Sequence, residues 1–251
     1  DRTTEAYQDA LVMALRKAQF KNPLLVWRSV LASLALVESD IAHISCSVGI
    51  IGHSNNGFDL QTIDLKSYNH QGNRILVPER KKIGVSCEHA AGYERLFNIA
   101  LGQLNAINSD KFLDVKQSKN IAALGLGRNV KSELLRSKNG LWKELTPPPN
   151  LEMPELDFSD DHRQLLTQLN ACDFLVFETF TEGRLRSRMH ANIENVFGRD
   201  VELLSDDAIA KAALFAADRY ARDIPIYFDY LPQISTIVQT GLEPTNFDLI
   251  D

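Results

Sequence analysis

The residues best suited to chemistry lie in Gly52–Gly57, GHSNNG, directly after an apolar run. Ser54 is placed as in the G-x-S-x-G nucleophile elbow, in which a strained turn between a strand and a helix exposes the serine hydroxyl. The fifth position is Asn56 instead of glycine, and the residues that follow, FDLQTIDLKS, have the near-alternating pattern of a strand. An elbow must lead into a helix, so the pattern favours a hairpin turn. A serine hydrolase that uses Ser54, with His190 and a later aspartate as partners, is a remote alternative.

The same segment could bind an anion through its backbone. Ser54, Asn55, Asn56 and Gly57 could turn their N–H groups toward a phosphate. A plain turn needs no such function, because Asn56-Gly57 is a favoured pair for a tight hairpin. The loop by itself favours the plain turn.

Metal-binding patterns are weak. His43-x-x-Cys46 and Cys87-Glu88-His89 are isolated pairs, whereas a closed zinc site needs four convergent ligands. The sequence therefore predicts no metal site, with the thiols in the core and the imidazoles at the surface.

Composition and charge exclude several classes of protein. The chain has 251 residues, of which 44% are hydrophobic and 24% charged, so it can bury a real core as one large domain or two small ones. Lys and Arg number 27 against 33 Asp and Glu, a net charge of -6, which argues against bulk nucleic-acid binding. The basic run Arg184, Arg186 and Arg188 is expected to be a solvated helix face, able at most to grip one phosphate group.

The cysteines and the apolar runs predict a cytoplasmic location. Three cysteines with no C-x-x-C pattern favour a reducing compartment. No apolar run is long enough to span a membrane, and the polar residues 1–10 do not resemble a signal peptide. Because the chain lacks an initiator Met and opens directly into a helix, we expect it to be a piece of something longer.

Hydrophobic periodicity predicts the elements that must position these residues. In the first half we expect a helix with Tyr7, Ala10, Leu11, Ala14 and Ala18 on one face, a strand over Leu24–Trp27, a buried helix over Ser29–Ser39, strands over Ile41–Ile51, Phe58–Lys66 and Ile75–Pro78, and a helix over residues 88–107. Residues 109–126 have poor periodicity and are predicted as loop or weak helix.

In the second half, a hairpin that turns at Asn139-Gly140 precedes the proline-rich connection Pro147–Pro154. There follow a helix capped by Ser159, a strand over Asp173–Phe177, a helix over Glu182–Phe197, a strand over Val201–Leu204, and a helix capped by Ser205 that runs to Ala221. Strand–helix alternation after an antiparallel opening indicates an α/β core with an α+β insertion.

Three stretches in this order resemble the nucleotide-binding domain of heat-shock protein 70 (DnaK-type) chaperones, in the actin-like ATPase superfamily. Lys17–Leu36 resembles the family's connection "N-E-P-T-A-A-A-L-A", and Ile50–Leu65 occupies the place of its second phosphate loop, "F-D-L-G-G-G-T-F-D-V". Asp173–Gly198 followed by Leu203–Ala217 resembles the adenosine segment "L-V-G-G-x-T-R-x-P" and its "P-D-E-A-V-A-x-G-A-A" helix. The resemblance spans nearly the whole chain and implies the second lobe of the domain, with ATP and magnesium as ligands.

The chain departs from the family at the residues that do the chemistry. Arg28 and Ser29 replace a Glu-Pro pair in the connection, and Gly52 replaces the aspartate that orders magnesium-bound water. Ser54-Asn55-Asn56 replaces a triple glycine, and Glu178-Thr179 replaces the Gly-Gly pair that lets a nucleotide approach the backbone. A carboxylate at Glu178 would also repel polyphosphate.

We therefore predict an actin-like ATPase (ribonuclease-H-like) lobe of α/β class, with residues 1–66 as its first part, 67–158 as an inserted α+β subdomain and 159–251 as its closing part. The expected function is a regulatory or interaction subunit, a chaperone-like pseudo-ATPase; the alternative is a working ATPase completed by a first lobe, which has no counterpart here. The catalytic residues are unknown, and the degenerate nucleotide site implied by the resemblance comprises Gly52, His53, Ser54, Asn55, Asn56, Gly57, Glu178, Thr179, Phe180 and Thr181.

A protein partner or an upstream first lobe is also expected. A lone second lobe would expose the cleft-facing sides of Val30 and Leu34, an apolar patch that soluble monomers rarely tolerate.

Overall fold

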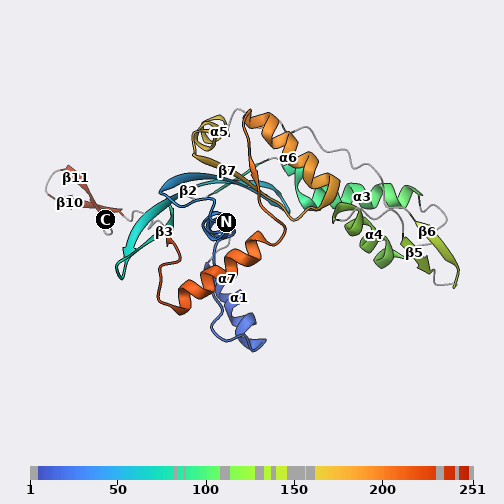
Figure 1. Ribbon diagram of the computed structural model, residues 1–251, viewed down its shortest axis with the longest axis horizontal. Helices are drawn as coiled ribbons and strands as arrows, with labels where there is room; N and C mark the ends of the chain where they lie inside the picture. The colour runs from blue at the N-terminus through green and yellow to red at the C-terminus, as the bar shows by residue number, and fades with distance from the viewer. Residues whose placement is uncertain are drawn as a thin grey trace.

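The chain folds around one mixed β-sheet. The computed structural model describes residues 5–81, 84–87, 89–107, 114–127, 133–136, 140–145, 156, 162–229, 235–240 and 243–248. The sheet has the strand order β8-β7-β1-β2-β3-β9, with β4 paired to β2 (Figure 1). Its strands are β1 (Cys46–Ser54), β2 (Gly57–His70), β3 (Asn73–Arg80), β4 (Val85–Cys87), β7 (Phe174–Glu178), β8 (Glu202–Leu203) and β9 (Phe228–Asp229). β1, β2 and β3 are antiparallel neighbours, whereas β7 is parallel to both β1 and β8. The expected α/β class is confirmed at this level.

Helices cover both faces of the sheet (Figure 1). The face that we call face A is covered by α2 (Arg28–Glu38) and α7 (Ala208–Ala221), which pack on Val48, Ile50 and Val176. The other face, face B, carries α5 (Arg163–Asn170), α6 (Gly183–Phe197) and part of α3 (Tyr93–Ile107), around Phe58 and Phe177. Successive strand residues point to opposite faces, so two separate hydrophobic cores form.

The buried helix predicted over Ser29–Ser39 is confirmed as α2, but its expected exposed patch is wrong. Val30 and Leu34 are fully buried in the core of face A. The run of small apolar residues on α2 lets α7 pack beside it, and this second helix covers the side that we expected to be open. The apolar exposure lies instead on α1 (Glu5–Lys17), whose predicted face, including Tyr7 and Leu11, is exposed.

The hairpin predicted at SNNG is confirmed with its turn one residue earlier. β1 pairs with β2 from Cys46↔Leu65 to Ser54↔Gly57, so the two-residue loop is Asn55-Asn56. Gly57 follows the loop with φ 127°, a conformation that favours glycine. The strand predicted over Leu24–Trp27 does not form, because this segment lies outside the sheet as irregular chain before α2.

The remaining predicted helices are present with different starts. Ser205 does not cap α7; the N-cap residue is Asp207, and the Ser205 hydroxyl donates to its Oδ1 at 2.8 Å. α5 begins after His162, and the expected cap Ser159 lies outside the described residues, as do Pro147–Pro154. Residues 109–126, predicted as loop or weak helix, include most of the helix α4 (Val115–Gly127).

The segment predicted as an insertion contributes first to the sheet. The boundary expected between residues 66 and 67 falls inside β2, and β3 and β4 both pair with that strand. Beyond them come η1 (His89–Ala91), α3, α4 and the strands β5 (Glu133–Arg136) and β6 (Trp142–Leu145). The pairing of β5 with β6 confirms the predicted hairpin, although Asn139 of its turn lies outside the described residues, and α4, β5 and β6 lie to one side of the sheet (Figure 1). A further hairpin joins β10 (Ser235–Thr240) to β11 (Glu243–Asp248). None of the helices in the described ranges has the length and hydropathy to cross a membrane.

Candidate functional site

The two segments that supply the predicted site residues meet at the ends of β1 and β7. These strands are parallel neighbours, and Gly52 pairs with Glu178. Residues that are far apart in sequence therefore lie together at the carboxyl ends of two neighbouring strands. Strand alternation then divides them between the two faces, which separates a cluster around Glu178 from a cluster around His53.

On face A, Glu178 forms an ion pair with Arg28 of α2. Arg28 Nη2 donates to Glu178 Oε1 at 2.5 Å, and the guanidinium carbon lies 3.7 Å from the centre of the Phe180 ring. Only 7% of the Glu178 side chain is exposed, against 30% for Arg28. Burial raises the pKa of Glu178, and the positive charge and hydrogen bond of Arg28 act in the opposite direction. The carboxylate that we expected to repel polyphosphate is therefore buried and paired with a cation.

A small cavity of about 110 Å³ lies beside this ion pair. Its polar lining is Arg28, Ser29, Asp59, Gln61 and Glu178, and Gly52 forms part of its wall. A Cβ added to Gly52 would lie 3.7 Å from the carbonyl oxygen of Asp59 and 3.9 Å from Glu178 Oε2. The missing side chain at Gly52 therefore leaves open a space next to two acceptor oxygens.

On face B, His53 is fully buried in a hydrogen-bonded chain. Its Nδ1 lies 2.9 Å from Thr179 Oγ1, which lies 2.9 Å from Thr181 Oγ1. Its Nε2 lies 2.9 Å from the carbonyl oxygen of Ala91. Burial lowers the pKa of His53 to about 4, so the ring is neutral at physiological pH. A neutral ring donates from one nitrogen only, so Nε2 donates to Ala91 and Nδ1 accepts from Thr179. These hydrogen bonds connect the end of β1 to the residues that follow β7 and to η1. They lie on face B, away from the Arg28–Glu178 pair on face A.

The hairpin turn packs against the start of α3. Glu94 N donates to the carbonyl oxygen of Asn55 at 3.2 Å. A Cβ on Gly92 would lie 2.5 Å from that same oxygen and 2.7 Å from Gly57 N, so only glycine permits this approach. Asn56 N donates to Ser54 Oγ at 3.3 Å. Of the N–H groups considered for a phosphate, that of Asn56 is thus bonded inside the turn and that of Gly57 is covered by Gly92, which supports the plain-turn interpretation.

The geometry gives no support to Ser54 as a nucleophile. β1 leads into β2 and not into a helix, so the elbow is absent. Ser54 Oγ donates to the carbonyl oxygen of Gly57 at 3.2 Å, whereas His190 Nε2 bonds the carbonyl oxygen of Val201 at 2.6 Å. Among the described residues, no hydrogen bond joins Ser54 to a histidine.

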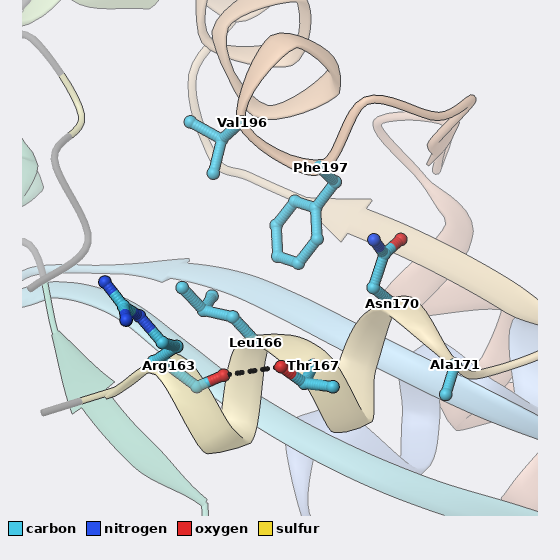
Figure 2. A pocket seen from close by; sticks show the side chains of 7 residues that line it. All are labelled: Arg163, Leu166, Thr167, Asn170, Ala171, Val196 and Phe197. Atoms are coloured by element: carbon cyan, nitrogen blue, oxygen red, sulfur yellow. Dashed lines mark hydrogen bonds between the residues drawn. The ribbon is translucent and has the colours of Figure 1, made fainter. Parts of the chain in front are cut away.

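A second hollow, of about 430 Å³, lies between α5 and the last turn of α6 (Figure 2). Leu166, Val196 and Phe197 line it, and Arg163 and Asn170 stand at its rim. The Thr167 hydroxyl donates to the carbonyl oxygen of Arg163 at 2.9 Å, within α5. None of the predicted site residues lines this hollow.

No group of three or more potential metal ligands occurs within the described ranges. Cys46, Cys87 and Cys172 are all free thiols. Burial raises the pKa of Cys46 and Cys172, which disfavours the thiolate form of both.

Sequence reasoning missed two residues of the cavity, Asp59 and Gln61, and treated Arg28 only as a departure from the family. The hairpin register would have found Asp59, because a two-residue loop at Asn55-Asn56 pairs it with Gly52. Gln61 lies two residues farther along the same strand and so on the same face. No local pattern pairs Arg28 with Glu178.

Comparisons with known proteins add no identification. A scan against protein-family models finds no match, and a search of curated proteins finds none either.

Proposed function

We propose that this chain is one lobe of an actin-like, DnaK-related ATPase fold whose nucleotide site is eroded, and that it acts as an interaction or regulatory subunit. Two features of the fold support the proposal. The segments that resemble the family's phosphate loop and adenosine motif lie side by side, paired in parallel from Ile50↔Val176 to Gly52↔Glu178. The antiparallel β1–β2–β3 unit is followed by parallel strands reached through helices, as expected of a ribonuclease-H-like lobe.

The main support for an eroded nucleotide site is the Arg28–Glu178 ion pair beside Gly52. Glu178 places a buried side chain where the family has glycine, and Gly52 offers no carboxylate to organise magnesium-bound water. The remaining cavity of about 110 Å³ is far smaller than the several hundred Å³ of an ordinary small-molecule site. Since Arg28 neutralises Glu178, we attribute the loss of nucleotide binding mainly to obstruction by the Glu178 side chain and to the missing magnesium ligand at position 52. Repulsion between Glu178 and the phosphates is the smaller effect.

Exposed apolar side chains on and after α1 support the interaction role. Tyr7, Met13 and Phe20 are 59%, 69% and 62% exposed. A groove of about 280 Å³, lined in part by Tyr7 and Leu11, lies between α1, Leu25–Trp27 and Tyr227–Asp229. Exposed aromatic and aliphatic side chains of this kind are typical of protein–protein contacts. We propose that the partner is a protein with a complementary apolar surface, either a first lobe or a separate subunit.

The second candidate function is an ATPase that a first lobe completes. The partly exposed Arg28 side chain favours it, because a partner that displaced Glu178 would free a cation for a phosphate.

The test is the free energy of unfolding with and without 5 mM MgATP. With a dissociation constant of about 1 mM or weaker, the nucleotide stabilises the chain by at most about 1 kcal/mol, whereas a micromolar constant gives about 5 kcal/mol. We expect the smaller effect. The matched variant Glu178→Gly with Thr179→Gly should respond more strongly to MgATP if obstruction is the cause. A large effect in the unaltered chain would contradict the proposal.

A further inference from the structure

We propose that the cavity beside Gly52 binds a small cationic nitrogen group, an ammonium or guanidinium head, in place of a phosphate. The inference rests on the proposed function, because it places a different ligand where the family holds polyphosphate.

The first support is an acceptor that the protein leaves unsatisfied. Glu178 Oε2 is buried and has no hydrogen-bond partner, while Oε1 of the same carboxylate is bonded to Arg28. This oxygen belongs to a side chain that is only 7% exposed and that lines the cavity. Buried carboxylate oxygens are costly to leave unpaired, so a donor is expected in the cavity.

The second support is the position of a second acceptor. The point where a Gly52 Cβ would stand lies 3.9 Å from Glu178 Oε2 and 3.7 Å from the carbonyl oxygen of Asp59. A nitrogen near this point, shifted toward the two oxygens, could donate to both. Gly52 keeps the point free.

The charges of the lining favour a cation over an anion. Two carboxylates, Asp59 and Glu178, face one guanidinium, Arg28. Asp59 Oδ1 accepts from the Ser86 hydroxyl, and Glu178 Oε1 accepts from Arg28, so the acidic side chains of the lining outnumber its cations by one. A phosphate would be repelled, whereas an organic cation supplies both charge and donors.

The size of the cavity limits the ligand to a head group on a short stem. About 110 Å³ accepts a guanidinium or a methylammonium but not a whole amino acid. The head could belong to a free amine or to an arginine or lysine side chain of the partner protein.

The test is an amide NMR titration with methylguanidinium chloride up to 20 mM, with sodium chloride at equal ionic strength as the reference. We expect saturable shifts at Gly52, Gly84 and Asp59, with a millimolar dissociation constant. Gly52→Ala fills the space at ordinary contact distances and should weaken binding at least tenfold. Gly102→Ala, whose Cβ meets nothing within 4 Å, is the matched control and should bind unchanged.

A second titration distinguishes the source of the cation. Blocked arginine amide should bind at least as tightly as methylguanidinium if a side chain is the natural ligand, and should fail to bind if only a free amine enters. Shifts that do not saturate, or that persist unchanged in Gly52→Ala, would overturn the inference. Such a result would leave the proposed function standing, since that proposal fails only if MgATP binds.

Discussion

Replacing Arg28 with Met tests the ion pair at the centre of the site. Methionine keeps an unbranched side chain against Phe180 but removes the guanidinium that donates to Glu178 at 2.5 Å. Removing one partner of a fully buried ion pair costs about 3–5 kcal/mol, and a charge-assisted hydrogen bond contributes about 1.5–3 kcal/mol. Because 30% of the Arg28 side chain is exposed and Glu178 can take up a proton, we expect a loss of about 2 kcal/mol at pH 8.

The loss should depend on pH in a definite direction. The pKa of Glu178 is raised by burial, and Arg28 supplies the two largest influences that lower it. A carboxyl whose pKa is raised by folding stabilises the protein below its unfolded pKa, and this stabilisation is lost as the pH rises through the folded pKa. Arg28→Met raises that folded pKa further. The variant should therefore lose little near pH 4, where Glu178 is mostly protonated in the folded and unfolded states, and most at pH 8.

Urea unfolding at pH 4, 6 and 8 measures this effect, with Glu178→Gln and the double variant completing a mutant cycle. Glu178→Gln should remove most of the pH dependence of the Arg28→Met loss. The reasoning is refuted if the loss is the same at every pH, or if the two substitutions are additive at pH 8.

Two further predictions concern the hairpin turn and the buried imidazole. Gly92→Ala should lower the free energy of unfolding by about 2–3 kcal/mol, because its Cβ would collide with the backbone of the turn. The control Gly102→Ala should be neutral or stabilise the chain by up to about 1 kcal/mol. Equal effects of the two substitutions in thermal unfolding would contradict the close approach at Gly92. The free energy of unfolding should fall by about 3 kcal/mol through His53 as the pH drops from 6.5 to 4. The reason is that the folded pKa of about 4 lies below the ordinary value, so that over this range the proton binds to His53 mainly in the unfolded state. His53→Gln should lack this part of the pH profile, and an unchanged profile in that variant would contradict the burial of a neutral ring.

The elements that the sequence predicted well are those with a strong local pattern. The small apolar residues of α2, the SNNG turn and the alternation of β7 each specify their structure within a few neighbouring residues. α4 was not predicted as a firm helix because its own periodicity is weak. Its buried residues Ile121, Ala122 and Leu126 depend on packing, which includes contacts with α3.

The site could be predicted only in part. The two segments were identified, and their meeting follows from the parallel pairing of β1 and β7. Strand alternation predicts that Gly52 and His53 lie on opposite faces of the sheet, but it does not predict which helices cover each face. The Arg28–Glu178 pair joins residues 150 positions apart, and the fit of Gly92 onto the turn depends on the path of a distant helix. Such contacts are set by the packing of whole elements, so no local spacing predicts them.

Isothermal titration of MgATP into this chain, and into any longer chain that contains it, tests most directly the central claim that the nucleotide site is eroded. We predict no binding tighter than about 1 mM, an affinity of about 4 kcal/mol, because Glu178 obstructs the site and Gly52 provides no carboxylate for magnesium. A micromolar dissociation constant in either chain, with binding reduced by Gly52→Ala, would contradict that claim. It would place a working nucleotide site at the carboxyl ends of β1 and β7.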